Sequence, residues 1–478
     1  MIKTKIVRFA LEWDWQDGAT LPGPRDRATF ARLRIAAGGQ PITLVSHDGQ
    51  VQDGVDVALY PLAEWVAENW WSLIADARPG TMISQLRFAY KRGVADQRAP
   101  WVQRSRRHVV RAAGDGYHWP DLMIVPEGRQ TRIIWMPDSD SAPATRYLTT
   151  GNALVESAAF TGQLAQFVDA VVARLDAAGL TGTPLHEAWS AVRSADAETA
   201  EFCRLTAQLG LDPYVDADAY RDDIVEVAGD LPSSMVFDFF NGVGRNRLLE
   251  RRDWLREARA RIGTAPAGMP LPGPIADLRE VCADLRELFH TPGAIEDPWD
   301  IGAETALRVR KWAGVGNTEP FDPAPFMRYE VQPTPHFDRG LVAVGSLRGA
   351  HGPTLVAARE FDDRPRRFLQ CRALWHFVCG EEEDFLIVAA HTHRQHIARG
   401  FALEALAPAQ GVARLLADPQ HLVTAEDVEQ IADDYLCGNI VVEHQLDNRV
   451  TGADFEWEPD RAAEDVLAVR PAPTGGRT

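Results

Sequence analysis

The chain has 478 residues, too many for one ordinary hydrophobic core, so we expect two or three domains. Its 45% hydrophobic and 25% charged residues are typical of a globular protein, and no apolar run reaches the roughly 18 residues of a membrane span. The formal charge of −18 argues against one large nucleic-acid clamp, because phosphate binding needs positive surface, but it leaves room for a local basic patch.

The N-terminal residues and the cysteines favour a cytoplasmic protein. The segment MIKTKIVRFALEWDW lacks the apolar stretch and the small-residue cleavage site of a signal peptide. Five cysteines are scattered along the chain without a CxxC pair, so neither a disulfide framework nor a zinc knuckle is indicated. We therefore expect reduced thiols, cytoplasmic residence and no membrane partner.

Residues 1–150 are predicted to form a β-rich domain with one amphipathic helix. Short β-branched or aromatic runs such as PITLVSH and TRIIWMP predict strands, because Gly, Pro and Asp separate them. Between these runs, residues 59–76 have apolar side chains at helical spacing. The tryptophans Trp65, Trp70 and Trp71 suggest either a ligand platform or an anchor on a small sheet, and we favour the anchor.

Residues 151–264 are predicted to form a helical domain, and 265–295 a linker with a connecting helix. The most basic stretch is the helix expected over residues 246–263. Its Arg251, Arg252 and Arg256 are candidates for nucleic-acid contact, but interspersed acids leave no clean basic face, so we favour a solvated or domain-bridging helix. Proline and glycine in APAGMPLPGP predict the linker, and residues 457–478 are predicted to be disordered.

Residues 296–450 carry several motifs in a defined order. A helix is expected over 298–314, followed by the strand-like runs LVAVGSL and PTLVAAR, the helices RRFLQCRALWHFV and RQHIARGFALEALAP, and the closing run IVVEHQLDN. In this order the motifs resemble the ImmA/IrrE family of metallo-endopeptidases over about 150 residues. The resemblance implies a zincin-like domain with a short sheet against two motif helices. The expected fold class is α+β and multidomain, with a β-rich N-terminal domain, a helical middle and this zincin-like C-terminal domain.

The residues at the family's catalytic positions are replaced. In the family's HExxH helix, two histidines four residues apart hold Zn²⁺ and the glutamate activates water. Alignment places Arg372 at the first histidine, Ala373 at the glutamate and His376 at the second histidine, while Gln395 stands at the third ligand, a glutamate. Arginine offers only donors and repels a cation, and alanine supplies no base. The resemblance thus implies a degenerate site without a cofactor.

A buried arginine needs a compensating partner. We expect Arg372 to fill the space vacated by zinc and to pair with an acid in the same pocket, either Glu404 or Glu443. The sequence does not decide between the two acids.

A cluster of histidines supports an alternative. His376 could combine with two of His391, His393 and His396 to rebuild a different zinc site, since imidazole is the commonest protein metal ligand. Against this alternative, no glutamate occupies the general-base position. A packed, non-ligating His376 is the favoured interpretation.

These features favour a non-catalytic ImmA/IrrE-like regulatory or recognition protein. It is expected to bind a protein partner or peptide through the former peptidase groove, in stress response, mobile-element control or phage defence. The first alternative is a zinc metallo-endopeptidase with non-standard histidine ligands, and the second is a DNA-binding transcriptional regulator. The role of the N-terminal domain and the oligomeric state are not indicated.

Overall fold

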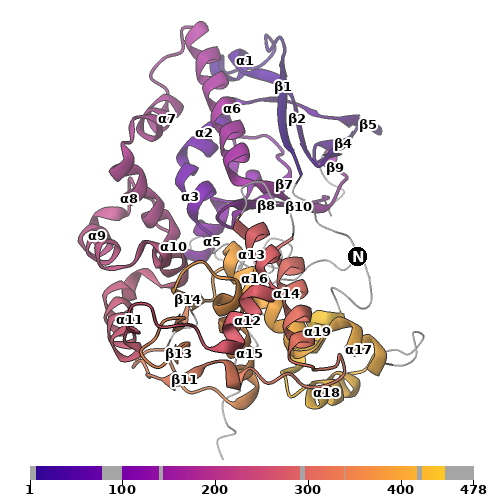
Figure 1. Ribbon diagram of the computed structural model, residues 1–478. Coiled ribbons are helices and arrows are strands. Elements are labelled where there is room, and N and C mark those ends of the chain that lie inside the picture. Colours follow the sequence, from indigo (N-terminus) through magenta and orange to yellow (C-terminus); the bar gives the residue numbers. More distant parts are fainter. Residues whose placement is uncertain are drawn as a thin grey trace, which may run out of the picture.

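The computed structural model describes residues 7–77, 100–138, 144–290, 297–337, 340–416 and 423–446. Within these residues the chain combines helices with sheets, so the expected α+β class is confirmed (Figure 1). No helix among them is long and apolar enough to cross a bilayer. The tail at 457–478, for which we predicted disorder, lies outside the described residues.

Antiparallel strands form the N-terminal region. β2 (Phe30–Ala37) lies between β1 (Phe9–Trp15) on one side and β3 (Gln40–Pro41) and β6 (Val55–Ala58) on the other. Every second side chain of β2 is buried, as expected for a strand with one face on a core. Two smaller groups of strands, in the orders β5-β4-β9 and β10-β8-β7, comprise β4 (Leu44–His47), β5 (Gln50–Asp53), β9 (Thr145–Tyr147), β10 (Gly151–Glu156), β8 (Gln130–Met136) and β7 (Asp121–Pro126).

Helices pack on these strands and share their core. The side chains of Trp65, Trp70 and Trp71 are buried there, and the Trp70 ring meets Trp189 edge to face at 5.0 Å. These tryptophans therefore anchor the helices, as the sequence favoured. The helices of this region are α1 (Pro24–Ala28), α2 (Tyr60–Glu68), α3 (Trp70–Ala75), α5 (Pro100–Arg106), the 3-10 turn η2 (Val110–Ala113), α6 (Ser157–Ala177), α7 (Pro184–Ser194) and α8 (Ala197–Gln208).

The C-terminal part of the chain contains a second four-stranded sheet, called the second sheet below, which is covered by helices on both faces. Its strand order is β11 (Arg328–Val331), β13 (Thr354–Ala357), β12 (Leu341–Ser346) and β14 (Asp384–Val388), with only the β11–β13 pair parallel among these strands. Side chains of β14 alternate: Leu386 and Val388 face one core, whereas Phe385 and Ile387 face the other. Burial on both faces explains why β12, β13 and β14 are mostly apolar, whereas β11 at the edge has the sequence RYEV and is only partly buried.

The first face of this sheet is covered by helices from the middle of the chain. These are α9 (Arg221–Asp230), α10 (Ser233–Gly242) and α11 (Leu248–Ile262), with the 3-10 turns η3 (Ala217–Tyr220) and η4 (Arg245–Arg247). In contrast, α6 and α7 belong to the N-terminal core, and α8 contributes to both. The helices between 151 and 264 are thus divided between the two sheet regions rather than joined in a core of their own.

The C-terminal helices share the core on the second face. They are α12 (Gly273–Val281), α13 (Ala283–His290), α14 (Pro298–Trp312), α15 (Asp363–Cys379), α16 (His393–Leu406), α17 (Ala409–Leu415), α18 (Ala425–Asp434) and α19 (Asn439–Gln445), with the 3-10 turn η5 (Ala324–Phe326). One of them, α15, contacts the sheet at β14. α14 and α16 pack closely because Gly302 has no side chain: a Cβ there would lie 2.4 Å from the Ile397 carbonyl oxygen. This packing fixes the position of α16, which carries most of the candidate site.

Candidate functional site

Helix α15 places two of the sequence-predicted residues in the interior. Arg372 and His376 are one helical turn apart and only 2% and 3% exposed, and Ala373 beside them is fully buried. The helix is buried on all sides from Phe368 to Cys379, because it lies between the second sheet and its neighbouring helices. No polar face of α15 therefore reaches solvent over its last three turns.

Arg372 contacts Gln395, the residue that aligns with the third zinc ligand of the ImmA/IrrE peptidases. Its Nη2 donates to the Val388 carbonyl oxygen at 2.9 Å and to the amide oxygen Oε1 of Gln395. The Gln395 Nε2 in turn donates to the Leu386 carbonyl oxygen at 2.8 Å. Burial and the positive charge of Arg399 lower the pKa of Arg372 well below its ordinary value. The site is thus a direct arginine–glutamine contact in an apolar interior.

The prediction that Arg372 pairs with Glu404 or Glu443 is wrong for both acids. Glu404 is nine residues along α16 from Gln395, about 13 Å along the axis, and accepts hydrogen bonds from Gln445 Nε2 and the Ala409 N–H at 2.9 and 3.2 Å. Glu443 is exposed on α19. An amide and a backbone carbonyl take the place of the expected carboxylate.

The nearest compensating acid is Asp238, which the sequence reasoning missed. It lies on α10, is 2% exposed, and accepts from Thr392 Oγ1 at 2.7 Å, from Gln395 Nε2 at 3.0 Å and from Arg394 Nη2 at 3.3 Å. Its charge also opposes the lowering of the Arg372 pKa. The signal was present in the sequence, since an aspartate inside the apolar helix SSMVFDFFNG is expected to be buried with partners.

The histidine cluster connects this domain with the N-terminal region. His391 Nδ1 lies 3.0 Å from His396 Nε2, and His396 Nδ1 lies 3.3 Å from a carboxylate oxygen of Glu127. Glu127 follows β7 and pairs with Arg132 Nε at 2.6 Å. The backbone N–H of His393 donates to the Glu127 carbonyl oxygen at 2.8 Å. A buried polar chain therefore joins the two regions at the start of α16.

These histidines are held in the neutral form. Burial is the main cause that lowers the pKa of His391 and His396, and it lowers that of His393 to about 4. Within the described ranges, no group of three or more His, Cys, Asp or Glu side chains is arranged to hold a metal ion. His376 faces elsewhere, because its ring stacks on Phe385 at 4.2 Å with an interplanar angle of 10°.

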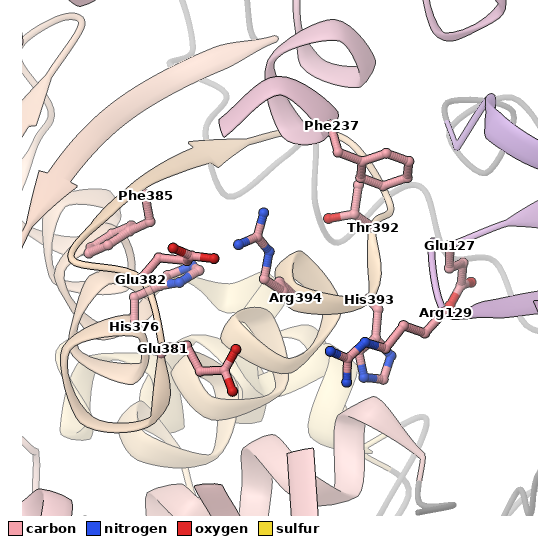
Figure 2. A pocket seen from close by; sticks show the side chains of 12 residues that line it. Glu127, Arg129, Phe237, His376, Glu381, Glu382, Phe385, Thr392, His393 and Arg394 are labelled. Atoms are coloured by element: carbon pink, nitrogen blue, oxygen red, sulfur yellow. The ribbon is translucent and has the colours of Figure 1, made fainter. Parts of the chain in front are cut away.

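A cavity of about 210 Å³ opens beside these residues (Figure 2). Three parts of the chain form it: the turn after β7, the helix α10, and the C-terminal domain around the end of α15 and the start of α16. In Figure 2 the Arg394 guanidinium projects toward the middle, with Glu382 and His376 on one side and Thr392 and Phe237 on the other. The lining residues are Glu127, Gly128, Arg129, Phe237, His376, Gly380, Glu381, Glu382, Phe385, Thr392, His393 and Arg394.

The candidates for nucleic-acid contact on α11 are engaged within the protein. Arg251 is fully buried and donates to Thr334 Oγ1 at 2.8 Å. Arg252 pairs with Glu226 and Asp230 at 2.5 and 2.9 Å. Arg256 remains exposed and forms an i,i+3 pair with Asp253 at 2.7 Å. The helix is domain-bridging in part, because Arg251 reaches the loop before β12.

Comparisons with family models, with curated proteins and with solved structures found no match to this chain. Whether a zinc ion of the kind held by the ImmA/IrrE peptidases would fit here depends on the donors present. At the aligned positions stand a guanidinium, a methyl group and an amide whose oxygen already accepts from Arg372. Only His376 offers a neutral nitrogen, so these residues do not fit a zinc ion.

Proposed function

We propose that this chain is a non-catalytic relative of the ImmA/IrrE peptidases that recognises a protein partner in the cytoplasm. In this proposal residues 296–450 adopt the zincin-like fold, with α15 as the former HExxH helix and α16 as the helix of the third ligand. The arrangement that supports it is the sheet backed by α15 and α16, with the aligned positions of the two helices in hydrogen-bond contact.

The observation that carries the proposal is the buried contact between Arg372 and Gln395. Two helices that once shared a metal ion need a new link when the metal is lost, because their polar groups would otherwise be buried without partners. A guanidinium donor and an amide acceptor provide that link, and Asp238 accepts the remaining amide hydrogen. The site is then stable without a cation and has no group to activate water.

Partner binding is assigned to the surface around the cavity. This surface is built jointly by the C-terminal domain, α10 and the turn after β7, so a bound segment contacts all three parts. The edge strand β14 contributes Phe385 to it. A partner seated here would be sensed by the N-terminal region through Glu127, which suits a regulatory protein.

The decisive experiment restores the family's metal site. The substitutions Arg372→His, Ala373→Glu and Gln395→Glu rebuild the ligand set together with His376, and Asp238→Asn removes the carboxylate that would repel the new glutamate. After equilibration with Zn²⁺ and gel filtration, we expect about one bound zinc ion in the restored variant. The wild type is expected to hold none and to leave peptide substrates intact.

The matched control carries the same substitutions and also His376→Ala, which removes one ligand and should lower zinc affinity strongly. If the restored variant binds no more zinc than this control, the assignment of α15 and α16 to the family's ligand positions is wrong. Stoichiometric transition metal and chelator-sensitive hydrolysis in the wild type would instead support the alternative peptidase with histidine ligands.

A further inference from the structure

The cavity beside α16 has two poles of opposite charge. On the positive side, Arg394 uses Nη2 to donate to the Ser234 carbonyl oxygen at 2.8 Å and to Asp238 at 3.3 Å. Its Nε and Nη1 have no partner among the described residues and are not buried. On the other side, Glu382 is exposed at the rim and makes no hydrogen bond or ion pair within the described ranges.

The start of α16 strengthens the positive pole. This helix has 14 residues, and its N-cap Thr392 makes no capping bond, because its hydroxyl donates to Asp238 instead. The first N–H groups of a helix have no intrahelical acceptor and favour a negative group near them, although the His393 N–H here already donates to the Glu127 carbonyl oxygen. The cavity borders this end of the helix through Thr392, His393 and Arg394.

A buried polar atom at this cavity also lacks a partner among the described residues. His376 is 3% exposed, its ring forms part of the wall, and its Nε2 has no hydrogen-bond partner in the part of the chain that the structure describes. Burial lowers its pKa well below the ordinary value, so the imidazole is neutral and adds no charge. Phe385, on the side of Glu382, and Phe237, on the opposite side of Arg394, add apolar surface to the cavity wall (Figure 2).

The size of the cavity limits the ligand. Its 210 Å³ is below the roughly 300–1,000 Å³ of pockets that take drug-sized molecules or cofactors. One amino-acid residue suits this space better than a nucleotide does. A residue that carries both a carboxylate and a cation would meet both poles.

We propose that the cavity binds the C-terminal residue of a protein partner when that residue is lysine or arginine. The inference rests on the function proposed above and names its ligand class. The terminal carboxylate lies against Arg394 and the first turn of α16, and the basic side chain extends toward Glu382 on the side of the cavity lined by His376 and Phe385. The neighbouring Glu381 adds negative charge at the same rim. An internal peptide segment lacks the carboxylate and leaves Arg394 without its ligand.

The test uses fluorescence anisotropy with labelled peptides of six randomised residues followed by a C-terminal lysine. The free-carboxylate pool is expected to bind at least about tenfold more tightly than the same pool with a C-terminal amide or a C-terminal leucine, as expected for a charge-assisted hydrogen bond. Arg394→Gln should remove the preference for the carboxylate. Because Arg394 also touches Asp238, circular dichroism must show that this variant is folded.

A charge reversal at the exposed rim gives an independent measurement. Glu382→Lys should shift the preference from peptides ending in lysine to peptides ending in glutamate. The matched control is Glu383→Lys, because Glu383 pairs with Arg348 at 3.2 Å and does not line the cavity. This control should retain the wild-type preference.

The outcomes separate the two proposals. Equal binding of amidated and free pools overturns terminal recognition but leaves peptide recognition intact. Free lysine that competes as well as the peptides shows a small-molecule site and overturns the partner terminus. Absence of binding by every pool overturns terminal recognition, and the zinc-restoration experiment then judges the proposed function separately.

Discussion

Replacement of Asp238 by alanine tests the network that holds the candidate site together. This carboxylate lies on α10 and accepts hydrogen bonds from Thr392, Gln395 and Arg394 of the following domain. Its removal leaves the buried hydroxyl of Thr392 without its acceptor and takes away the anion nearest to Arg372. We therefore expect loss of stability centred on β14 and the start of α16.

The size of the effect follows from burial. Thr392 and Gln395 are 2% and 0% exposed, and an unsatisfied buried donor costs about 1–3 kcal/mol. Arg394 contributes less, because its side chain is 25% exposed and water screens its charge. Breaking a buried charge pair costs about 3–5 kcal/mol, and the individual losses do not add fully. For Asp238→Ala we expect the unfolding free energy to fall by about 3–5 kcal/mol.

Urea unfolding followed by circular dichroism measures this loss, and hydrogen exchange locates it. Asp238→Asn keeps one acceptor oxygen and removes the charge, so its loss should be smaller, about 1–3 kcal/mol. Asp218→Ala serves as the exposed control, because that side chain is 96% exposed, and it should change stability by less than about 0.5 kcal/mol. A loss below about 1 kcal/mol in Asp238→Ala would refute the reasoning.

Three further predictions concern other parts of the fold. The pKa of His393 falls from 6.5 to about 4 on folding, so the unfolded chain binds more protons between these pH values. The free energy of unfolding should therefore be at its full value above pH 6.5 and fall by ~3 kcal/mol as the pH drops to 4. In urea titrations at a series of pH values, His393→Gln should remove this part of the pH dependence. Glu127→Gln leaves the buried Arg132 without its 2.6 Å carboxylate, so protease cleavage at the junction of the two regions should become faster and stability should fall by about 3–5 kcal/mol. Gly302→Ala should separate α14 from α16 and lower the melting temperature. Gly162→Ala is the control, because a Cβ at this position of α6 has no neighbour within 4 Å, and it should raise stability by up to about 1 kcal/mol. An unchanged melting temperature in Gly302→Ala would contradict the close packing.

For the His393 prediction the neighbours must be considered together. Its charged form is disfavoured by burial, is favoured by Glu127, and is opposed by His396, Arg129 and Arg132. The pKa of Glu127 is itself held low by Arg132 and His396 against its burial, so protonation of this acid also costs stability as the pH falls. Glu127 acts below its ordinary pKa of 4.5, whereas His393 acts between pH 6.5 and 4, so a His393→Gln variant with an unchanged slope above pH 4.5 would contradict the prediction.

Local patterns of residues predicted individual helices and strands but not the contacts between them. The run RRFLQCRALWHFV predicted a helix, and α15 covers it because its residues favour helix and its end meets Gly380. The run PITLVSH predicted one strand and contains β4. Periodicity reports on neighbours a few residues apart, and for such elements it suffices.

Partners across long separations could not be predicted in this way. Gln395 and Asp238 are 157 residues apart, and nothing in the pattern of either helix specifies the other. The sequence predicts an acidic partner for Arg372 in the helices that follow it, whereas the acid whose charge acts on Arg372 lies in α10 of the preceding region. Likewise the sequence predicts a separate domain for residues 1–150, although the turn at Glu127 forms part of the cavity.

The charges around Arg372 add to the case against a cation at this position. Arg372 and Arg399 both donate to the Val388 carbonyl oxygen, at 2.9 and 3.2 Å, and Arg394 lies on the other side of Gln395. Asp238 is the acid that offsets this local excess of positive charge. A divalent ion brought here would meet guanidinium groups at close range in an apolar interior, where such repulsion is poorly screened. Substitution of Arg372 is therefore the first requirement for metal binding, and a variant that keeps Arg372 but restores Ala373→Glu and Gln395→Glu should remain without zinc.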